Sequence, residues 1–251
     1  MKPLRAAVMI ADFVQSVAHG FRQLLLPGAC LACHQPLPPE RMDFCADCLE
    51  GFATDPFGAC SRCGSTIGPH AGGSDGCVRC RKESYAFERA VRFGPYTGLL
   101  RALILRMKQP GGEPLAEAVG ESWAELRFPI LRSLRPSLVI PVPLHWYRRW
   151  QRGFNQSELL AGAIARRLQV PMRARWLKRV RHTPKQSMLT PTERRDNVKG
   201  AFRVSRLSRL QGQTVLLIDD VLTTGSTAHE AARALKKAGA AEIVVAVLGH
   251  G

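Results

Sequence analysis

The chain has 251 residues, of which 45% are hydrophobic and 22% charged, so it can bury a core and is not globally disordered. Its formal net charge is +16, and residues 145–210 hold 17 basic against 3 acidic residues, so most of the excess lies in one stretch. A field of this sign favours a polyanionic partner: a nucleic acid, a phosphorylated metabolite or an anionic membrane surface.

The N-terminal segment has no apolar run near the roughly 18 residues that span a bilayer. Lys2 and Arg5, an apolar stretch and then Cys30 weakly resemble a lipoprotein signal, but polar residues such as Asp12 interrupt the stretch. We therefore expect an amphipathic helix within residues 1–27, no transmembrane segment and a cytoplasmic protein.

All eight cysteines form Cys-x-x-Cys pairs within residues 30–80. A two-residue gap lets both sulfurs reach one ion about 2.3 Å away, and tetrahedral zinc takes two such pairs. The four pairs therefore predict two zinc sites, and four thiolates leave no open coordination position, so both sites are expected to be structural. The ligands are Cys30, Cys33, Cys45, Cys48, Cys60, Cys63, Cys77 and Cys80.

Paired cysteines have three other uses. Disulfides need an oxidising compartment, a redox Cys-x-x-Cys normally occurs once at the head of a helix, and iron–sulfur spacing is tighter and less regular. Which pairs share an ion is open, with consecutive pairing as the first choice and a cross-braced arrangement as the second. Residues 28–84 hold few large apolar side chains, so we expect metal to drive folding of this zinc-ribbon module.

Strand and helix patterns alternate downstream of the cysteines. This alternation predicts an α/β domain over residues 85–251, with a mostly parallel sheet and helices on both faces. In chain order we expect a strand over 87–93, helices over 99–107 and 114–126, a strand over 138–140, a helix over 156–168, an extended segment over 175–180, a basic loop or short helix over 181–200, a strand over 214–218, a helix over 226–238 and a strand over 242–248.

Residues 215–227 read Val-Leu-Leu-Ile-Asp-Asp-Val-Leu-Thr-Thr-Gly-Ser-Thr, a buried strand followed by a hydroxyl-rich loop and a helix start. Amides and the helix dipole favour a phosphate there. The segment lacks the Gly-Lys-Ser/Thr of a nucleotide triphosphate loop. Asp219 and Asp220 would repel the anion, so we expect them to bind ribose hydroxyls, with or without Mg²⁺. Thr227 and Glu230 have the spacing of a capping box.

This segment resembles the phosphoribosyl pyrophosphate signature of type I phosphoribosyltransferases. The four cysteine pairs and the segment 140–157, with Pro-Val-Pro-Leu and Arg-Gly-Phe-Asn-Gln-Ser, extend the resemblance to the ComF (competence protein F, GntX-like) family over about residues 30–250. The resemblance implies a type I phosphoribosyltransferase-like fold that binds phosphoribosyl pyrophosphate, or another phosphorylated ribose ligand, together with Mg²⁺. The ligand-binding residues it implies are Asp219, Asp220, Thr223, Thr224, Gly225, Ser226, Thr227, Pro143 and Arg152.

The segment 183–202 resembles the mobile loop that closes over the ligand in related enzymes. There Lys185, Arg194 and Arg195 would act as catalytic residues that supply positive charge to the leaving pyrophosphate, and the alternative is a solvated basic face. Some purine phosphoribosyltransferases carry a third acid where this chain has Thr223. Transfer to an acceptor is therefore an open question.

The ComF resemblance also implies a role in DNA uptake during natural transformation, with a DNA-uptake protein as partner. Aromatic side chains interleave the basic stretch and could stack the bases of single-stranded DNA, although we expect Phe154 and Trp176 in the core. The two hypotheses are a phosphoribosyltransferase-type enzyme and a single-stranded DNA-binding protein that reuses the phosphate site. The aromatic residues are Trp146, Tyr147, Trp150, Phe154 and Trp176.

Overall fold

The structure is a computed structural model. It describes residues 28–38, 43–55, 58–68, 76–181, 197–205 and 209–251. Contacts divide the chain into two compact units, residues 1–50 and 51–251. The helix predicted within residues 1–27 lies outside the described residues, and the predicted domain boundaries stay a prediction.

Among the described residues, no helix combines the length and the apolar character that crossing a membrane requires.

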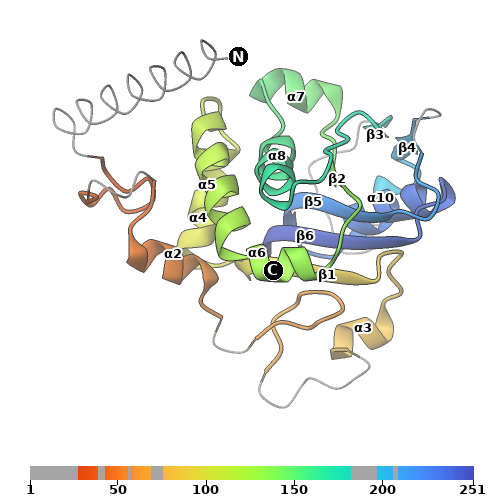
Figure 1. Cartoon of the computed structure of the whole chain (residues 1–251), viewed down its shortest axis with the longest axis horizontal. Helices are drawn as coiled ribbons and strands as arrows, with labels where there is room; N and C mark the ends of the chain where they lie inside the picture. Colours follow the sequence, from red (N-terminus) through yellow and green to blue (C-terminus); the bar gives the residue numbers. More distant parts are fainter. Residues whose placement is uncertain (1–27, 39–42, 56–57, 69–75, 182–196, 206–208) are drawn as a thin grey trace, which may run out of the picture. The chain divides into compact units, whose positions relative to one another are not determined.

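A four-stranded parallel sheet forms the centre of the second unit (Figure 1). The strand order is β1-β6-β5-β2. The two central strands pair from Thr214–Glu242 to Leu222–His250, and their apolar side chains are buried except that of Val221, which is half-buried. The strands are β1 (Arg89–Pro95), β2 (Leu138–Pro141), β5 (Thr214–Leu222) and β6 (Glu242–His250).

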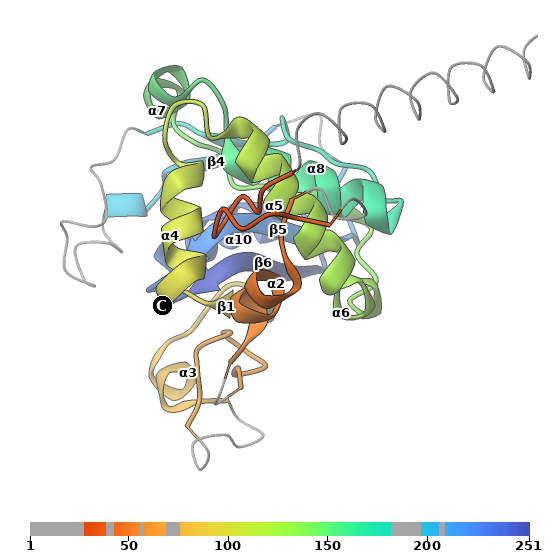
Figure 2. The ribbon, with the colours of Figure 1, turned by 90° about the vertical axis from the view of Figure 1, so that its left-hand side faces the viewer.

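Helices cover both faces of this sheet, as the α/β pattern predicts. On one face α8 contacts β2 and β5, and α5 packs on α8; α4 and α5 lie in front of the strands in Figure 2. On the other face Ala228, Ala231 and Leu235 of α10 share one buried cluster with Val215 and Leu217 of β5. These helices are α4 (Gly98–Met107), α5 (Glu113–Leu126), α8 (Gln156–Leu168) and α10 (Ser226–Lys237).

Shorter elements complete the described chain. The strands β3 (Leu177–Arg179) and β4 (Phe202–Val204) form an antiparallel pair. The short helices are α2 (Ala46–Ala53), α3 (Val78–Lys82), α6 (Phe128–Ser133) and α7 (Trp146–Arg152). Neither α6 nor α7 is predicted, because helices of six and seven residues are too short to show a helical period over a window of about 11–18 residues.

The prediction that the strand starting at Thr214 ends at Ile218 is wrong, because β5 is longer. Asp219 and Val221 still pair with Val247 and Gly249 of β6, so the strand continues to Leu222. The two acidic residues therefore belong to the strand and not to the loop after it, which fixes the direction of both side chains.

Phe52, Arg62 and Thr66 lie along the outer edge of β1. The amide of Ala90 donates to the carbonyl oxygen of Arg62 at 3.0 Å, and Arg92 donates to Thr66 Oγ1 at 2.9 Å. The backbone approaches so closely at Gly94 that an added Cβ would lie 1.9 Å from the carbonyl oxygen of Phe52. An edge strand that would otherwise present free amides is thus covered by the segment that carries the third cysteine pair.

Candidate functional site

Asp219 and Asp220 lie near the carboxyl end of β5, where open α/β sheets bind ligands. Asp220 Oδ2 accepts from Gln156 Nε2 at 2.7 Å and from Lys108 Nζ at 3.0 Å. Asp219 Oδ1 accepts from Ser157 Oγ at 3.1 Å and from the Asp220 amide at 2.9 Å. Two neighbouring acids are therefore held by donors from α8 and by a cation at the end of α4. We call Asp219 and Asp220 the acid pair.

The start of α8 aims its donors at the acid pair. Asn155 caps the helix by accepting from the Ser157 amide at 3.2 Å, and its own amide donates to the carbonyl oxygen of Val142 at 3.1 Å. Arg152 Nη1 donates to Gln156 Oε1, which turns the Gln156 amide group toward the acid pair. Arg152, a predicted ligand residue, thus contacts Gln156, which in turn contacts Asp220 of the acid pair.

The acid pair carries an electrostatic cost. Burial, and then the charge of Asp220, raise the pKa of Asp219 to about 7, while Lys108 and Ser157 act in the opposite direction. Asp219 is nevertheless partly accessible. The environment of this carboxyl group disfavours its charged form, so a partner that stabilises the charge would bind there favourably. A partly exposed carboxyl group with such a pKa is therefore a candidate ligand-binding group.

Three arginines gather beside this site. Burial lowers the pKa of Arg179 to about 10, with a further lowering from Arg148, while Asp219 raises it. Burial also lowers the pKa of Arg148 and of Arg152, and Asp220 raises that of Arg152. The cost of keeping these guanidinium groups charged would be relieved by an anion bound among them.

The loop after β5 is a hydroxyl-rich turn that leads into α10. Gly225 has φ +79° and forms the N-cap of α10. Thr224 Oγ1 and Ser226 Oγ lie 2.8 Å apart, and the Ser226 amide donates to Thr224 Oγ1 at 3.4 Å. The positive end of the twelve-residue helix α10 therefore begins in a hydroxyl-rich turn, a favourable setting for a phosphate.

The capping box expected from Thr227 and Glu230 is wrong. The helix begins two residues earlier than that spacing requires, with Gly225 and not Thr227 as N-cap, and Gly225 makes no side-chain cap. Glu230 instead accepts from the Gly200 amide at 2.9 Å and from Arg233 Nη2 at 2.8 Å. The carboxylate anchors the segment before β4 and does not cap α10.

The structure brings most predicted ligand residues to one end of β5. The predicted residues Thr223, Thr224, Gly225, Ser226 and Thr227 begin three positions after Asp220, at the end of β5, and Pro143 lies in the loop between β2 and α7. Lys185, Arg194 and Arg195 lie outside the described residues. Sequence reasoning missed five side chains near the acid pair: Lys108, Arg148, Gln156, Ser157 and Arg179. For Gln156 and Ser157 the available signal was their place in the conspicuous Arg-Gly-Phe-Asn-Gln-Ser segment.

The cysteines form two groups of consecutive pairs, Cys30/Cys33/Cys45/Cys48 and Cys60/Cys63/Cys77/Cys80, which we call the first and second clusters. Within each cluster the four sulfurs lie within 4.8 Å of one another. The sulfurs of Cys60 and Cys80 are 3.8 Å apart and those of Cys63 and Cys77 3.6 Å. Four sulfurs at 2.3 Å from a tetrahedral ion would be about 3.8 Å apart, so the geometry fits a four-thiolate metal site.

Backbone amides favour a thiolate in each cluster. Burial raises the pKa of Cys30, but the amides of Cys33, Cys45 and Ala32 outweigh it and lower the pKa to about 6. In the second cluster the amides of Cys63, Arg62 and Cys77 likewise outweigh burial and lower the pKa of Cys60 to about 7. Both clusters thus hold a sulfur prepared to bind a cation.

Comparison with known proteins agrees with this arrangement. The model of the phosphoribosyl transferase domain matches residues 155–250, from the cap of α8 through the acid pair to the end of β6. The chain is 32% identical to competence protein F of Haemophilus influenzae over 224 residues, 86% of this chain and 94% of that protein. It is 32% identical to the DNA utilization protein YhgH of Escherichia coli K12 over 228 residues, 88% and 96% of the two chains. Competence protein ComFC of Bacillus subtilis is 29% identical over 150 residues, 59% of this chain and 58% of that protein.

Replacing Lys108 by Met is expected to destabilise the protein more at alkaline than at acidic pH. Lys108 lowers the pKa of Asp219, so its loss raises that pKa further and penalises the charged acid pair. We expect a loss of about 2 kcal/mol in the free energy of unfolding near pH 8 and a smaller loss near pH 5, where Asp219 is protonated. Urea unfolding at the two pH values measures it.

The matched control is Lys236→Met. Lys236 pairs with Glu88 on the surface, so its loss should change stability by less than about 1 kcal/mol at both pH values. Equal losses near pH 5 and pH 8 for Lys108→Met would contradict a role in stabilising the charged acid pair.

Proposed function

This chain belongs to the family of competence protein F and the DNA utilization protein YhgH, and we propose that it binds phosphoribosyl pyrophosphate or another phosphorylated ribose ligand at the acid pair and the loop 223–227. One observation carries the proposal: β5 ends in both an acid pair and a hydroxyl-rich turn that starts a helix. The turn suits the phosphate and the carboxylates suit the ribose hydroxyls.

Each acid of the pair uses one of its two carboxylate oxygens in contacts with described residues. All contacts of the pair within the described part of the chain use Asp219 Oδ1 and Asp220 Oδ2. Oδ2 of Asp219 and Oδ1 of Asp220 are thus unused by described residues. Hydroxyl groups that donate to these oxygens would form charge-assisted hydrogen bonds, which are the stronger class.

Positive charge for a pyrophosphate comes from the same surroundings. Arg148, Arg152 and Arg179 lie beside the acid pair, and their burial disfavours their charge until an anion is present. Bound Mg²⁺ would supply further neutralisation of the pyrophosphate, with the acid pair as the acidic groups near it. We further propose that Lys185, Arg194 and Arg195 approach the leaving pyrophosphate if the ligand reacts.

Zinc is the ion we propose for both clusters. Four sulfurs with tetrahedral spacing match its preference, and a site with four protein ligands has a structural role. The location in the cytoplasm, where thiols stay reduced, remains part of this proposal.

Exposed aromatic rings on α7 favour a second function, the binding of single-stranded DNA. Trp146 is 70% exposed and Trp150 78%, and Tyr147 stacks on Trp150 with ring centroids 6.5 Å apart. Large exposed aromatic side chains beside arginines suit base stacking. Phe154 is buried, as expected, and Trp176 packs against the core. The names of the relatives agree with a role in DNA handling, which we extend to this chain.

Replacing both Asp219 and Asp220 by Asn should weaken binding of phosphoribosyl pyrophosphate at least tenfold in calorimetry, since hydrogen bonds to charged groups contribute about 1.5–3 kcal/mol each. Affinity should rise from about pH 6 to about pH 8, because the carboxylate form of Asp219, with its pKa near 7, accepts the hydroxyl protons. With Asp219→Asn alone, the affinity should rise with pH only as far as ionisation of the ligand's own phosphate groups makes it rise.

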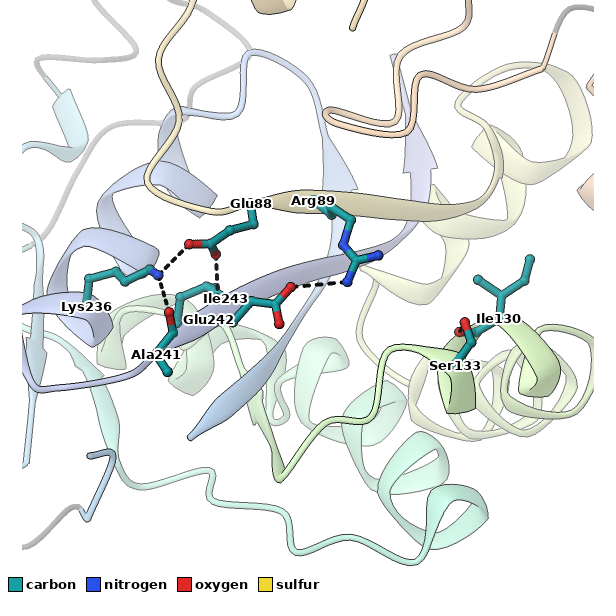
Figure 3. Close-up of polar contacts among 8 residues, drawn as sticks. All are labelled: Glu88, Arg89, Ile130, Ser133, Lys236, Ala241, Glu242 and Ile243. Atoms are coloured by element: carbon teal, nitrogen blue, oxygen red, sulfur yellow. Dashed lines mark hydrogen bonds and ion pairs between the residues drawn. The ribbon is translucent and has the colours of Figure 1, made fainter. Parts of the chain in front are cut away.

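The control is Glu242→Gln, which removes an acid paired with Arg89 at the amino end of β6 (Figure 3) and should leave affinity unchanged. Wild-type affinity in the double variant would show that the acid pair is a structural remnant.

Metal analysis of the purified protein should find two zinc ions per chain. Replacing Cys30 and Cys33 by Ser should leave one ion, because two thiolates do not complete a tetrahedral site. Iron with visible absorbance, or eight titratable thiols without metal, would refute the assignment.

Replacing Trp146 and Trp150 by Ala should weaken binding of a labelled oligothymidine by at least tenfold, since stacking contributes about 1–3 kcal/mol per base. The loss should persist at high salt, because stacking does not depend on counterion release. Trp146→Phe with Trp150→Phe, which keeps two rings, should retain most of the affinity. No binding by the wild-type protein near 50 mM salt, a low-salt condition that favours phosphate contacts, would exclude the DNA function.

A further inference from the structure

Tyr85 contacts the phosphate loop. Its hydroxyl donates to the carbonyl oxygen of Thr224 at 3.4 Å. Its ring lies so close to Gly225 that an added Cβ there would be 2.6 Å from Cε1. The ring therefore forms a wall behind the turn and limits the conformations that Gly225, a residue with wide backbone freedom, can reach.

The same side chain also packs on the second cluster. Tyr85 and Ile67 are the partly buried apolar residues packed against its four cysteines. The ring stacks on Phe87, with centroids 4.7 Å apart and an interplanar angle of 15°, and Phe87 is buried in the core beside α10. One ring thus touches the cysteine cluster, the core and the phosphate loop.

The chain after Tyr85 is fastened along α10. The Ala86 amide donates to His229 Nδ1 at 3.1 Å. Farther along, Glu88 accepts from Lys236 Nζ and from the Ile243 amide, the latter at 2.7 Å (Figure 3). Downstream of Tyr85 the segment is therefore held by α10 and β6. Upstream, the Glu83 amide donates to the carbonyl oxygen of Arg79 at 3.0 Å, at the end of α3, the helix that carries Cys80.

We propose that Tyr85 is a positioning residue through which metal in the second cluster holds the phosphate loop ready for its ligand. A metal ion joins four separated points of the chain, so it restrains the segment that leads into Tyr85. Without the ion the second cluster no longer restrains this segment, and we expect the ring to fix the turn at Gly225 less firmly. A loop that must order on binding loses affinity. This inference rests on the proposed phosphate function of the loop.

The first test measures phosphoribosyl pyrophosphate affinity by calorimetry in three variants with intact clusters. Tyr85→Ala should weaken binding about tenfold, the scale of losing one well-packed aromatic contact and the order it imposes. Tyr85→Phe keeps the ring and loses only a long hydrogen bond, so it should restore affinity to within about threefold of wild type. Ile67→Ala, which also packs on the cluster, should leave affinity unchanged and so separates positioning from general damage to the cluster.

The second test compares the clusters. Cys60→Ser with Cys63→Ser and Cys30→Ser with Cys33→Ser should each remove one metal ion. Only the first double variant should weaken the ligand's binding and speed hydrogen exchange of the amides in residues 224–228. Equal affinity losses from both double variants, or none from Tyr85→Ala, would overturn the proposal. If the second-cluster variant does not fold, the three Tyr85 and Ile67 variants decide.

Failure of the ligand function is distinguishable from failure of this inference. If the wild-type protein binds no phosphoribosyl pyrophosphate, the proposed function fails. The coupling is then judged by hydrogen exchange alone: faster exchange in residues 224–228 of Tyr85→Ala, but not of Ile67→Ala, supports it, and unchanged exchange overturns it.

Discussion

Two adjacent carboxylates near the end of a buried central strand are the constraint on which the rest of the site depends. An acid in such a place is costly unless it is paired or hydrogen-bonded. Lys108 at the end of α4 and the first two residues of α8 meet that need with contacts of 2.7–3.1 Å. The ends of both helices are thus tied to the acid pair.

Local signals made the order of strands and helices, the cysteine pairs and the phosphate loop predictable. Apolar periodicity and the two-residue gaps need no knowledge of distant contacts. The pairing of Lys108 with Asp220 joins residues far apart in the chain, and no local pattern carries it. The same reason explains the error at Glu230, whose carboxylate binds the Gly200 amide across space. The role of Gln156 depends on a rotamer that its contact with Arg152 sets, which sequence alone does not contain.

The two cysteine clusters look alike in sequence, yet they belong to different compact units. The second cluster is built into the unit of the sheet: Cys63 Sγ lies 3.2 Å from Ser65 Oγ, and Ser65 Oγ lies 3.4 Å from His250 Nε2 at the end of β6. Burial lowers the pKa of His250 to about 3, so this imidazole is neutral and adds no positive charge beside the sulfurs. Through Ser65 and His250, a metal ion in the second cluster would thus be connected to the end of the sheet at which β5 presents the acid pair.

The basic stretch is not a uniform surface for polyanions. In α7, Arg149 pairs with Glu158, whereas Arg148 and Arg152 are partly buried toward the acid pair. Charge counting therefore overstates the number of cations that DNA phosphates could reach. The exposed rings of Trp146 and Trp150 would then be the main feature of this helix for the proposed DNA binding. The two proposed ligands would thus use opposite sides of α7. An anion bound beside Arg148 and Arg152 would relieve their burial cost and stabilise the helix that carries the rings. The linkage is reciprocal, so DNA stacked on the rings would favour the phosphorylated ligand by the same factor.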